Sequence, residues 1–117
     1  PINTLTETQA DEKWFNRLNE IIQENISNTE FSVDQLTRSV NMSRTLLYAK
    51  VKAVTGLTPN EFIRLVRLRK AAEYLAGNEY KINEICYMVG FNSPSYFAKC
   101  FQNQFGVLPK DFINNTN

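Results

Sequence analysis

An internal repeat is the feature that most constrains what this chain can fold into. Residues 31–40 match residues 80–89 at an offset of 49, and residues 43–63 match residues 93–113 at an offset of 50. The offset changes because Gly90-Phe91-Asn92 stands where the first copy has Asn41-Met42. Insertions are tolerated in turns, so the repeat predicts two copies of one supersecondary unit.

Each copy contains the signals for a short helix, a tight turn and a longer helix. Ser32 with Gln35 forms a capping box for the first short helix, and Ser43 caps the longer helix that Gly56 ends. In the second copy the turn contains Phe91, which we expect to pin it to the core, and Ser93 starts the longer helix. These proportions are those of a helix-turn-helix.

The segments around the two copies complete an all-α prediction. Residues 1–12 lack apolar periodicity and are predicted to be a linker or tail, and residues 13–117 are predicted to form the domain. Thr58-Pro59-Asn60-Glu61 is a strong helix start. The predicted parts are a first helix-turn-helix at 31–56, a linker helix at 59–76, a second helix-turn-helix at 80–106 and a terminal helix at 109–114.

Composition excludes several classes of function. The chain of 117 residues has no histidine, which removes the commonest general base and a frequent zinc ligand, so we expect neither a cofactor nor a metal. Cys86 and Cys100 fall in apolar helical patterns and are predicted to be reduced core residues. Without a membrane-spanning stretch or a signal peptide, the chain is predicted to be a soluble, cytoplasmic protein without membrane contact.

Charge is distributed unevenly along the chain. Residues 1–30 carry a net charge of −4 and residues 31–117 a net charge of +5. Within residues 43–70 the one acidic residue is Glu61, which indicates a surface for a polyanion, although a solvated helix face would give the same pattern. The basic residues of this zone are Arg44, Lys50, Lys52, Arg64, Arg67, Arg69 and Lys70.

The longer helix of each copy can lie in a DNA major groove, and helical spacing predicts which residues it presents. The residues expected on or beside the inner stripe of the first copy are Leu46, Leu47, Lys50, Val51 and Val54, and the expected inner stripe of the second is Tyr96, Phe97, Cys100, Phe101 and Phe105. The expected outward residues are Thr45, Tyr48, Ala49 and Lys52 in the first copy, and Ser95, Ala98, Lys99, Gln102 and Asn103 in the second.

The chemistry of these side chains suggests roles at DNA. Ser43 and Ser93 can cap their helices, hold a phosphate, or do both. Lys99 can donate to guanine O6 and N7 or to a phosphate.

Residues on the flanks of the first copy are candidates for contacts with the DNA backbone. Arg44 and Lys52 are expected to act as phosphate clamps. Tyr48 can bond a phosphate, stack on a sugar, or be partly buried.

The linker helix allows one chain to place two readers on DNA. Its 17 or so residues span about 26 Å, and the bodies of the two copies make up the rest of the roughly 34 Å between adjacent major grooves. Because the outward residues of the two copies differ, the predicted binding site of one monomer is asymmetric.

The chain resembles the AraC/XylS family of bacterial transcription regulators over about residues 14–114. The most specific part of the resemblance is INEICYMVGFNSPSYFAKCFQNQFGVLPKDF, at residues 82–112. The first copy, SVDQLTRSVNMSRTLLYAKVKAVTGLTPNEFIR, looks most like the C-terminal output domain of Bacteroides-type hybrid two-component regulators, in which a sensor kinase, a receiver and a DNA-binding domain share one chain.

The resemblance implies about seven helices that bind promoter DNA, contact RNA polymerase and usually activate transcription, with any dimerisation made by domains outside this chain. It also implies base contacts at Thr45, Tyr48 and Ala49 and at Ser95 and Lys99. Many relatives have Arg at the position of Ala49. The usual residue of the family at the position of Cys86 is Ala. Ala49 cannot donate a hydrogen bond, so the second copy is expected to discriminate more between bases.

Two other classes of function are compatible with parts of the sequence. A helical protein-interaction module would use the basic faces to bind an acidic partner, but the doubled turn would then be unexplained. An enzyme with Cys86 or Cys100 as its nucleophile would need an activating base, and the chain has no histidine to supply one.

Overall fold

The computed structural model describes the backbone of residues 2–116 and the side chains of residues 9–113. Across these residues the backbone forms seven α-helices and no strand, which confirms the predicted all-α class. The helices are α1 (Ile2–Glu24), α2 (Val33–Val40), α3 (Arg44–Thr55), α4 (Pro59–Gly77), α5 (Ile82–Met88), α6 (Pro94–Phe105) and α7 (Pro109–Thr116).

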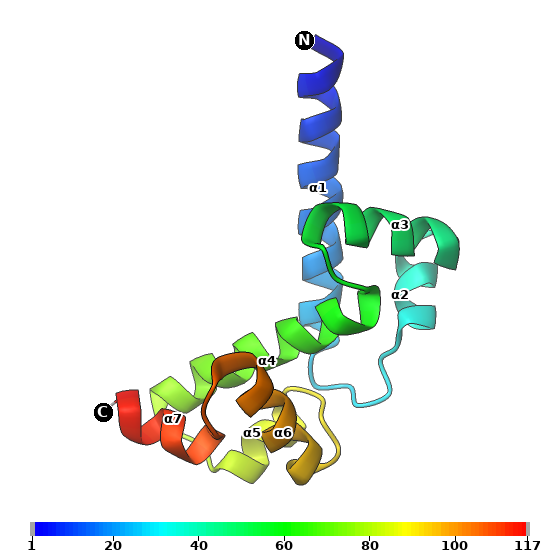
Figure 1. Cartoon of the computed structure of the whole chain (residues 1–117). Helices are drawn as coiled ribbons and strands as arrows, with labels where there is room; N and C mark the ends of the chain where they lie inside the picture. Colours follow the sequence, from blue (N-terminus) through cyan, green and yellow to red (C-terminus); the bar gives the residue numbers. More distant parts are fainter. Residues whose placement is uncertain (1, 117) are drawn as a thin grey trace.

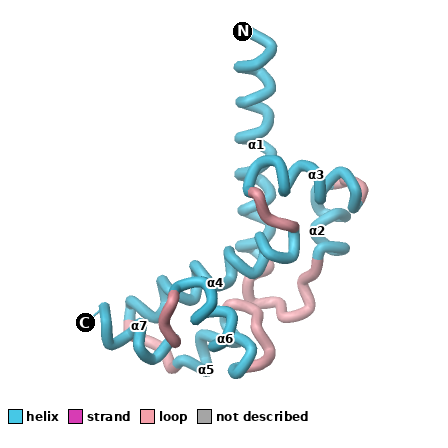
Figure 2. The backbone as a smooth tube through the Cα atoms, viewed as in Figure 1, coloured by secondary structure: helices cyan, strands magenta, loops and turns pink. Residues whose placement is uncertain are grey.

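Helix α4 connects two ends of an elongated molecule that measures 49 × 30 × 22 Å. Figure 1 shows α2 and α3 beside α1 at one end of α4, and α5, α6 and α7 gathered along its other end. The connections are short, and the longest, at residues 25–32, joins α1 to α2 (Figure 2). We call α2 and α3 the first unit, and α5 and α6 the second unit.

Each unit has its own hydrophobic cluster. In the first, α1 packs against the first unit and the start of α4 through Leu18, Ile22, Leu36, Leu47, Val51 and Phe62. In the second, the remainder of α4 packs against the second unit and α7 through Leu68, Leu75, Ile85, Val89, Phe97 and Phe101. Phe91 is buried and its ring lies 5.2 Å from that of Phe97, so it does pin the second turn to the core.

The predicted helix starts are confirmed by their hydrogen bonds. Ser43 Oγ accepts from the backbone N–H of Leu46, and Ser93 Oγ accepts from that of Tyr96. Thr58 and Glu61 bond reciprocally, each side chain accepting from the other's backbone N–H, at 2.9 and 3.2 Å. These bonds satisfy donors that the first turn of a helix otherwise leaves unpaired, and so fix where the helices begin.

Helix α1 begins earlier than the apolar pattern predicts. It starts at Ile2, whereas the pattern starts at Lys13, and residues 9–13 are exposed. Backbone hydrogen bonds can propagate a helix past the end of its buried face, which explains the difference. The assignment of residues 1–12 to a linker or tail stays a prediction.

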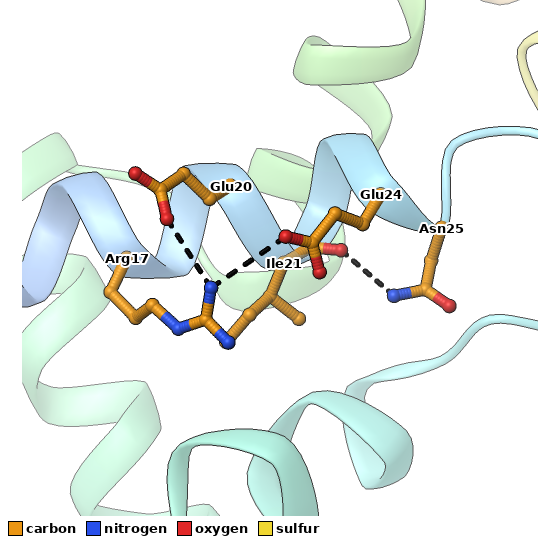
Figure 3. A network of polar contacts seen from close by, with 5 residues as sticks. All are labelled: Arg17, Glu20, Ile21, Glu24 and Asn25. Carbon is orange, nitrogen blue, oxygen red and sulfur yellow. Dashed lines mark hydrogen bonds and ion pairs between the residues drawn. The ribbon is translucent and has the colours of Figure 1, made fainter.

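The solvent face and C-terminal end of α1 are shown in Figure 3. Arg17 Nη1 lies 3.2 Å from Glu20 Oε2 and 3.6 Å from Glu24 Oε1. Asn25 Nδ2 donates to the carbonyl of Ile21 at 2.8 Å, which satisfies one of the carbonyls left free at a helix end. Among the described residues, no helix is long and apolar enough to cross a membrane.

Candidate nucleic-acid interface

Helix α3 presents a polar and basic outer face. Thr45, Ala49 and Lys52 are exposed, as the spacing predicts, and Tyr48 is half-buried, which is the alternative left open for it. Arg44 pairs with the carboxylate of Asp34 on α2, and its guanidinium lies 5.9 Å from the ring centroid of Tyr48.

Arg44 stays exposed to solvent despite this pairing. Its side chain is 55% exposed and that of Asp34 71% exposed. Exposed ion pairs of this kind contribute little to stability, so Arg44 can leave the carboxylate at small cost.

Helix α6 presents the matching face of the second unit. Ser95, Lys99 and Gln102 are exposed, and Ala98 is half-buried. Ser93 Oγ lies 3.2 Å from Ser95 Oγ, so the two hydroxyls meet at the start of the helix. The capping role predicted for both Ser43 and Ser93 is confirmed, and their role toward phosphate stays a prediction.

A polar hollow of about 330 Å³ lies between α4, the second turn and α6. Its lining includes Asn60, Arg64, Asn92 and Tyr96. Arg64 is half-buried, and its Nη1 donates to Tyr96 Oη at 3.4 Å. Arg64 of α4 therefore lies beside the start of α6.

Arg67 does not belong to the surface predicted to bind DNA. Its side chain is only 7% exposed, and its guanidinium donates to backbone carbonyls rather than to solvent. The prediction that Arg67 contacts DNA was wrong, because the distribution of charge along the sequence does not show whether a side chain is buried. Arg67 lies one helical turn from both Ile63 and Ala71, which are buried, and this spacing was the available signal.

Three residues expected on the inner stripes are about half exposed: Leu46 at 49%, Val54 at 46% and Tyr96 at 50%. Tyr96 lies three residues before Lys99 and seven before Asn103, on the face already predicted to point outward. The prediction that Tyr96 lies on the inner stripe was therefore wrong, because the hydrophobicity of its ring was given more weight than its position on the helix.

Both cysteines are buried and free, as predicted. Cys86 is fully buried, and desolvation raises the pKa of its thiol. A raised pKa keeps the thiol protonated and unreactive, which agrees with a packing role.

Known helix-turn-helix proteins are similar to this chain in sequence. The chain matches a family described as a helix-turn-helix domain over residues 36–115. Over 94% of its length it is 41% identical to Histidine kinase P4 of Formosa agariphila, and over 82% it is 34% identical to the HTH-type transcriptional regulator MtrA of Neisseria gonorrhoeae. The matched stretches are 8% and 33% of those relatives, so the chain spans a minor part of their length.

Among solved structures, the chain is similar to the C-terminal domain of AraT, a response regulator from Geobacillus stearothermophilus. The TM-score is 0.79 at 26% sequence identity, covering 87% of this chain and 84% of that one. A likeness of this extent includes both units and the helix between them.

Proposed function

Because this chain belongs to the AraC-type family of helix-turn-helix domains, we propose that it binds double-stranded DNA sequence-specifically and regulates transcription, with α3 and α6 in adjacent major grooves. The observation that carries the proposal is the pair of reading helices. Each starts at a serine cap, buries two bulky side chains completely and exposes small, polar or basic residues on the other side. Such a face allows close approach to base edges and phosphates.

The contacts divide between bases and backbone. Thr45, Tyr48 and Ala49 in α3 and Ser95 and Lys99 in α6 face the bases. Phosphates are met at the helix starts by Ser43 and Ser93, and along the flanks by Arg44, Lys52, Arg64 and Gln102. Ala98, half-buried on α6, lets that helix approach the groove closely.

The two units contribute unequally to base discrimination. Ala49 and Lys99 occupy the same position of the repeat, and Lys99 alone of the two can donate to guanine. The second unit therefore discriminates more strongly, and the site of one monomer is asymmetric.

The longer protein is a two-component signalling regulator in this proposal. Support comes from the 41% identity to a stretch of a histidine kinase and from the likeness to the output domain of a response regulator. This domain would not itself be an enzyme. It would act on promoter DNA in the cytoplasm as an activator that contacts RNA polymerase, with kinase activity and dimerisation supplied by other domains.

An unbiased selection of bound duplexes from a random pool tests this proposal. We expect one asymmetric site with two separated half-sites to be enriched. Fluorescence anisotropy on that duplex should show affinity falling about 10- to 10²-fold between about 50 and 200 mM salt, as the three or so phosphates met by lysine or arginine release counterions.

Failure to enrich any duplex, or binding that salt does not weaken, would contradict the proposal. Salt-sensitive binding to an acidic protein with no binding to duplex DNA would instead identify a helical protein-interaction module.

A further inference from the structure

The guanidinium of Arg67 bonds at once to the loop that leads into the first unit and to the turn of the second. Nη1 donates to the carbonyl of Ile26, just after α1, at 2.7 Å and to that of Val89, in the turn of the second unit, at 2.8 Å. Nη2 donates to the carbonyls of Asn28 and Phe31, in the loop that leads into the first unit, at 3.2 and 3.5 Å. One side chain of α4 therefore joins the entry of the first unit to the turn of the second.

Arg67 is a buried cation that backbone dipoles balance. Among the side chains of residues 9–113, none of the ion pairs includes Arg67. The carbonyls of Ile26 and Val89 lie at the C-terminal ends of α1 and α5, where the helix dipole is negative. Burial lowers the pKa of Arg67, but an arginine remains charged at neutral pH. Moving either unit away would leave this charge partly unpaired, which is costly.

Gly90 makes room for this joint. A Cβ added there would lie 1.3 Å from Arg67 Nη1 and 2.4 Å from the carbonyl oxygen of Ile26. The φ angle of Gly90 is also +92°, which side-chain-bearing residues rarely adopt. In the first turn Asn41 stands at the matching place, also with a positive φ of 54°, and the second turn is longer by one residue.

Apolar packing joins the two units only weakly. Ile26, partly buried, is the one side chain common to the two clusters defined within the described residues. The clusters hold each unit to its own part of α4, whereas the bonds of Arg67 tie the units to each other.

We propose that Arg67 is a positioning residue that fixes the relative placement of α3 and α6, and thereby sets the spacing between half-sites that the protein accepts. This inference rests on the proposed DNA-binding function. Inserting one base pair between half-sites moves the second by about 3.4 Å and rotates it by about 35°. If Arg67 fixes α3 relative to α6, the two helices cannot follow that displacement. If α4 alone joins them, the two helices can shift relative to each other and follow it.

The experiment compares binding across spacings, using the chain described here and the duplex obtained by selection. Variants of this duplex carry one or two base pairs more or fewer between the half-sites, and further duplexes carry a single half-site. The proteins are the wild type, Arg67→Met, Arg67→Lys and the matched control Arg69→Met, which removes one exposed arginine from the same helix.

For the wild type and Arg69→Met, we expect affinity to fall at least about tenfold for each base pair of altered spacing. Arg67→Met should keep wild-type affinity for single half-sites, but its affinities for duplexes of different spacing should differ by no more than about threefold. Arg67→Lys, which keeps the charge but has a smaller set of donors, should fall between the two.

Each remaining outcome has a fixed meaning. If the wild type binds no duplex, the proposed function itself fails. If the wild type binds without a spacing preference, or if folded Arg67→Met keeps the wild-type spacing profile or loses single half-site binding, the positioning role is wrong. If circular dichroism shows that both Arg67 variants have lost their helices, Arg67 is required for folding and the positioning role is likewise rejected.

Discussion

The two units follow one plan but are held in place differently. In the first, Asn41 closes the turn in the left-handed region with φ of 54°, and Trp14 of α1 reaches the turn by donating to Met42 Sδ at 3.1 Å. In the second, Gly90 stands in the turn and the brace is Arg67. The first turn is supported by half-buried Trp14 of α1, and the second by the buried charge of Arg67.

This difference shows which features the repeat carries. The serine caps, the terminal glycines and the fully buried positions recur in both units. Leu47 and Val51 in the first unit correspond to Phe97 and Phe101 in the second, so the stripe recurs while its side chains change. The braces do not recur. Local geometry of each reading helix therefore follows from the repeat, whereas the placement of one unit against the other depends on residues outside it.

The largest expected effect is on the free energy of unfolding, when the residue at positive φ in each turn is substituted. Gly90→Ala should lower the free energy of unfolding by about 2 to 5 kcal/mol, because it adds left-handed strain to a clash with Arg67. Asn41→Gly should change it by no more than about 0.5 kcal/mol, because relief of strain offsets the greater entropy of the unfolded chain. Urea denaturation of both variants, analysed by linear extrapolation, measures the difference.

Equal losses for the two turn variants would mean that the turns are equivalent and that Arg67 does not constrain the second. A small effect of Gly90→Ala would contradict the close approach of Arg67 to that turn.

The next effect tests whether the second unit discriminates more than the first. Lys99→Ala gives the second unit the residue that the first has at Ala49. The variant should lose about 1 to 3 kcal/mol of binding free energy at one base pair of the selected site and bind other substitutions at that pair equally well. Anisotropy against a panel of duplexes with single base-pair changes measures this profile.

Lys52→Ala is the control for Lys99→Ala, since Lys52 is exposed on the flank of α3. Loss of a phosphate contact should weaken all duplexes alike and reduce the salt slope by about 1. If Lys99→Ala behaves in this way too, Lys99 contacts a phosphate and the second unit does not owe its discrimination to that residue.

Much of the fold could be predicted because its determinants are local. Ser43, Ser93 and the Thr58–Glu61 box lie within a few residues of the groups that they bond, and sequence spacing alone reveals them. The outward faces of α3 and α6 could be predicted for the same reason.

The role of Arg67 could not be predicted, because it depends on distant partners. The carbonyls that Arg67 bonds lie between 22 and 41 residues away, and a backbone carbonyl has no sequence signature. Tyr96 was misplaced for a different reason. Hydrophobicity assigns an aromatic ring to the core, whereas its position on α6 places it with Lys99 beside Arg64.

The smallest expected effect concerns the helix that follows each reading helix. Glu61 accepts from the backbone N–H of Thr58, and this bond, followed by the bond with the Thr58 side chain, lowers the pKa of Glu61 below its ordinary value of 4.5. In the repeat, Leu108 takes the place of Thr58, and it has no side-chain oxygen with which to close such a box at the start of α7. The start of α4 should therefore contribute a pH dependence that the start of α7 cannot reproduce in this way.

The sign follows from the lowered pKa of Glu61. Ionised Glu61 stabilises the fold at pH values above 4.5, and this contribution is lost as the pH falls through the folded-state pKa. Glu61→Gln keeps an acceptor for the Thr58 N–H but removes the charge, so it should be slightly less stable than the wild type at pH 7, and the gap should close between about pH 5 and pH 3. Thermal melts of both proteins across this range measure the gap. If the difference in melting temperature between the two proteins stays constant or widens in acid, Glu61 acts at the start of α4 through its shape and not through its charge.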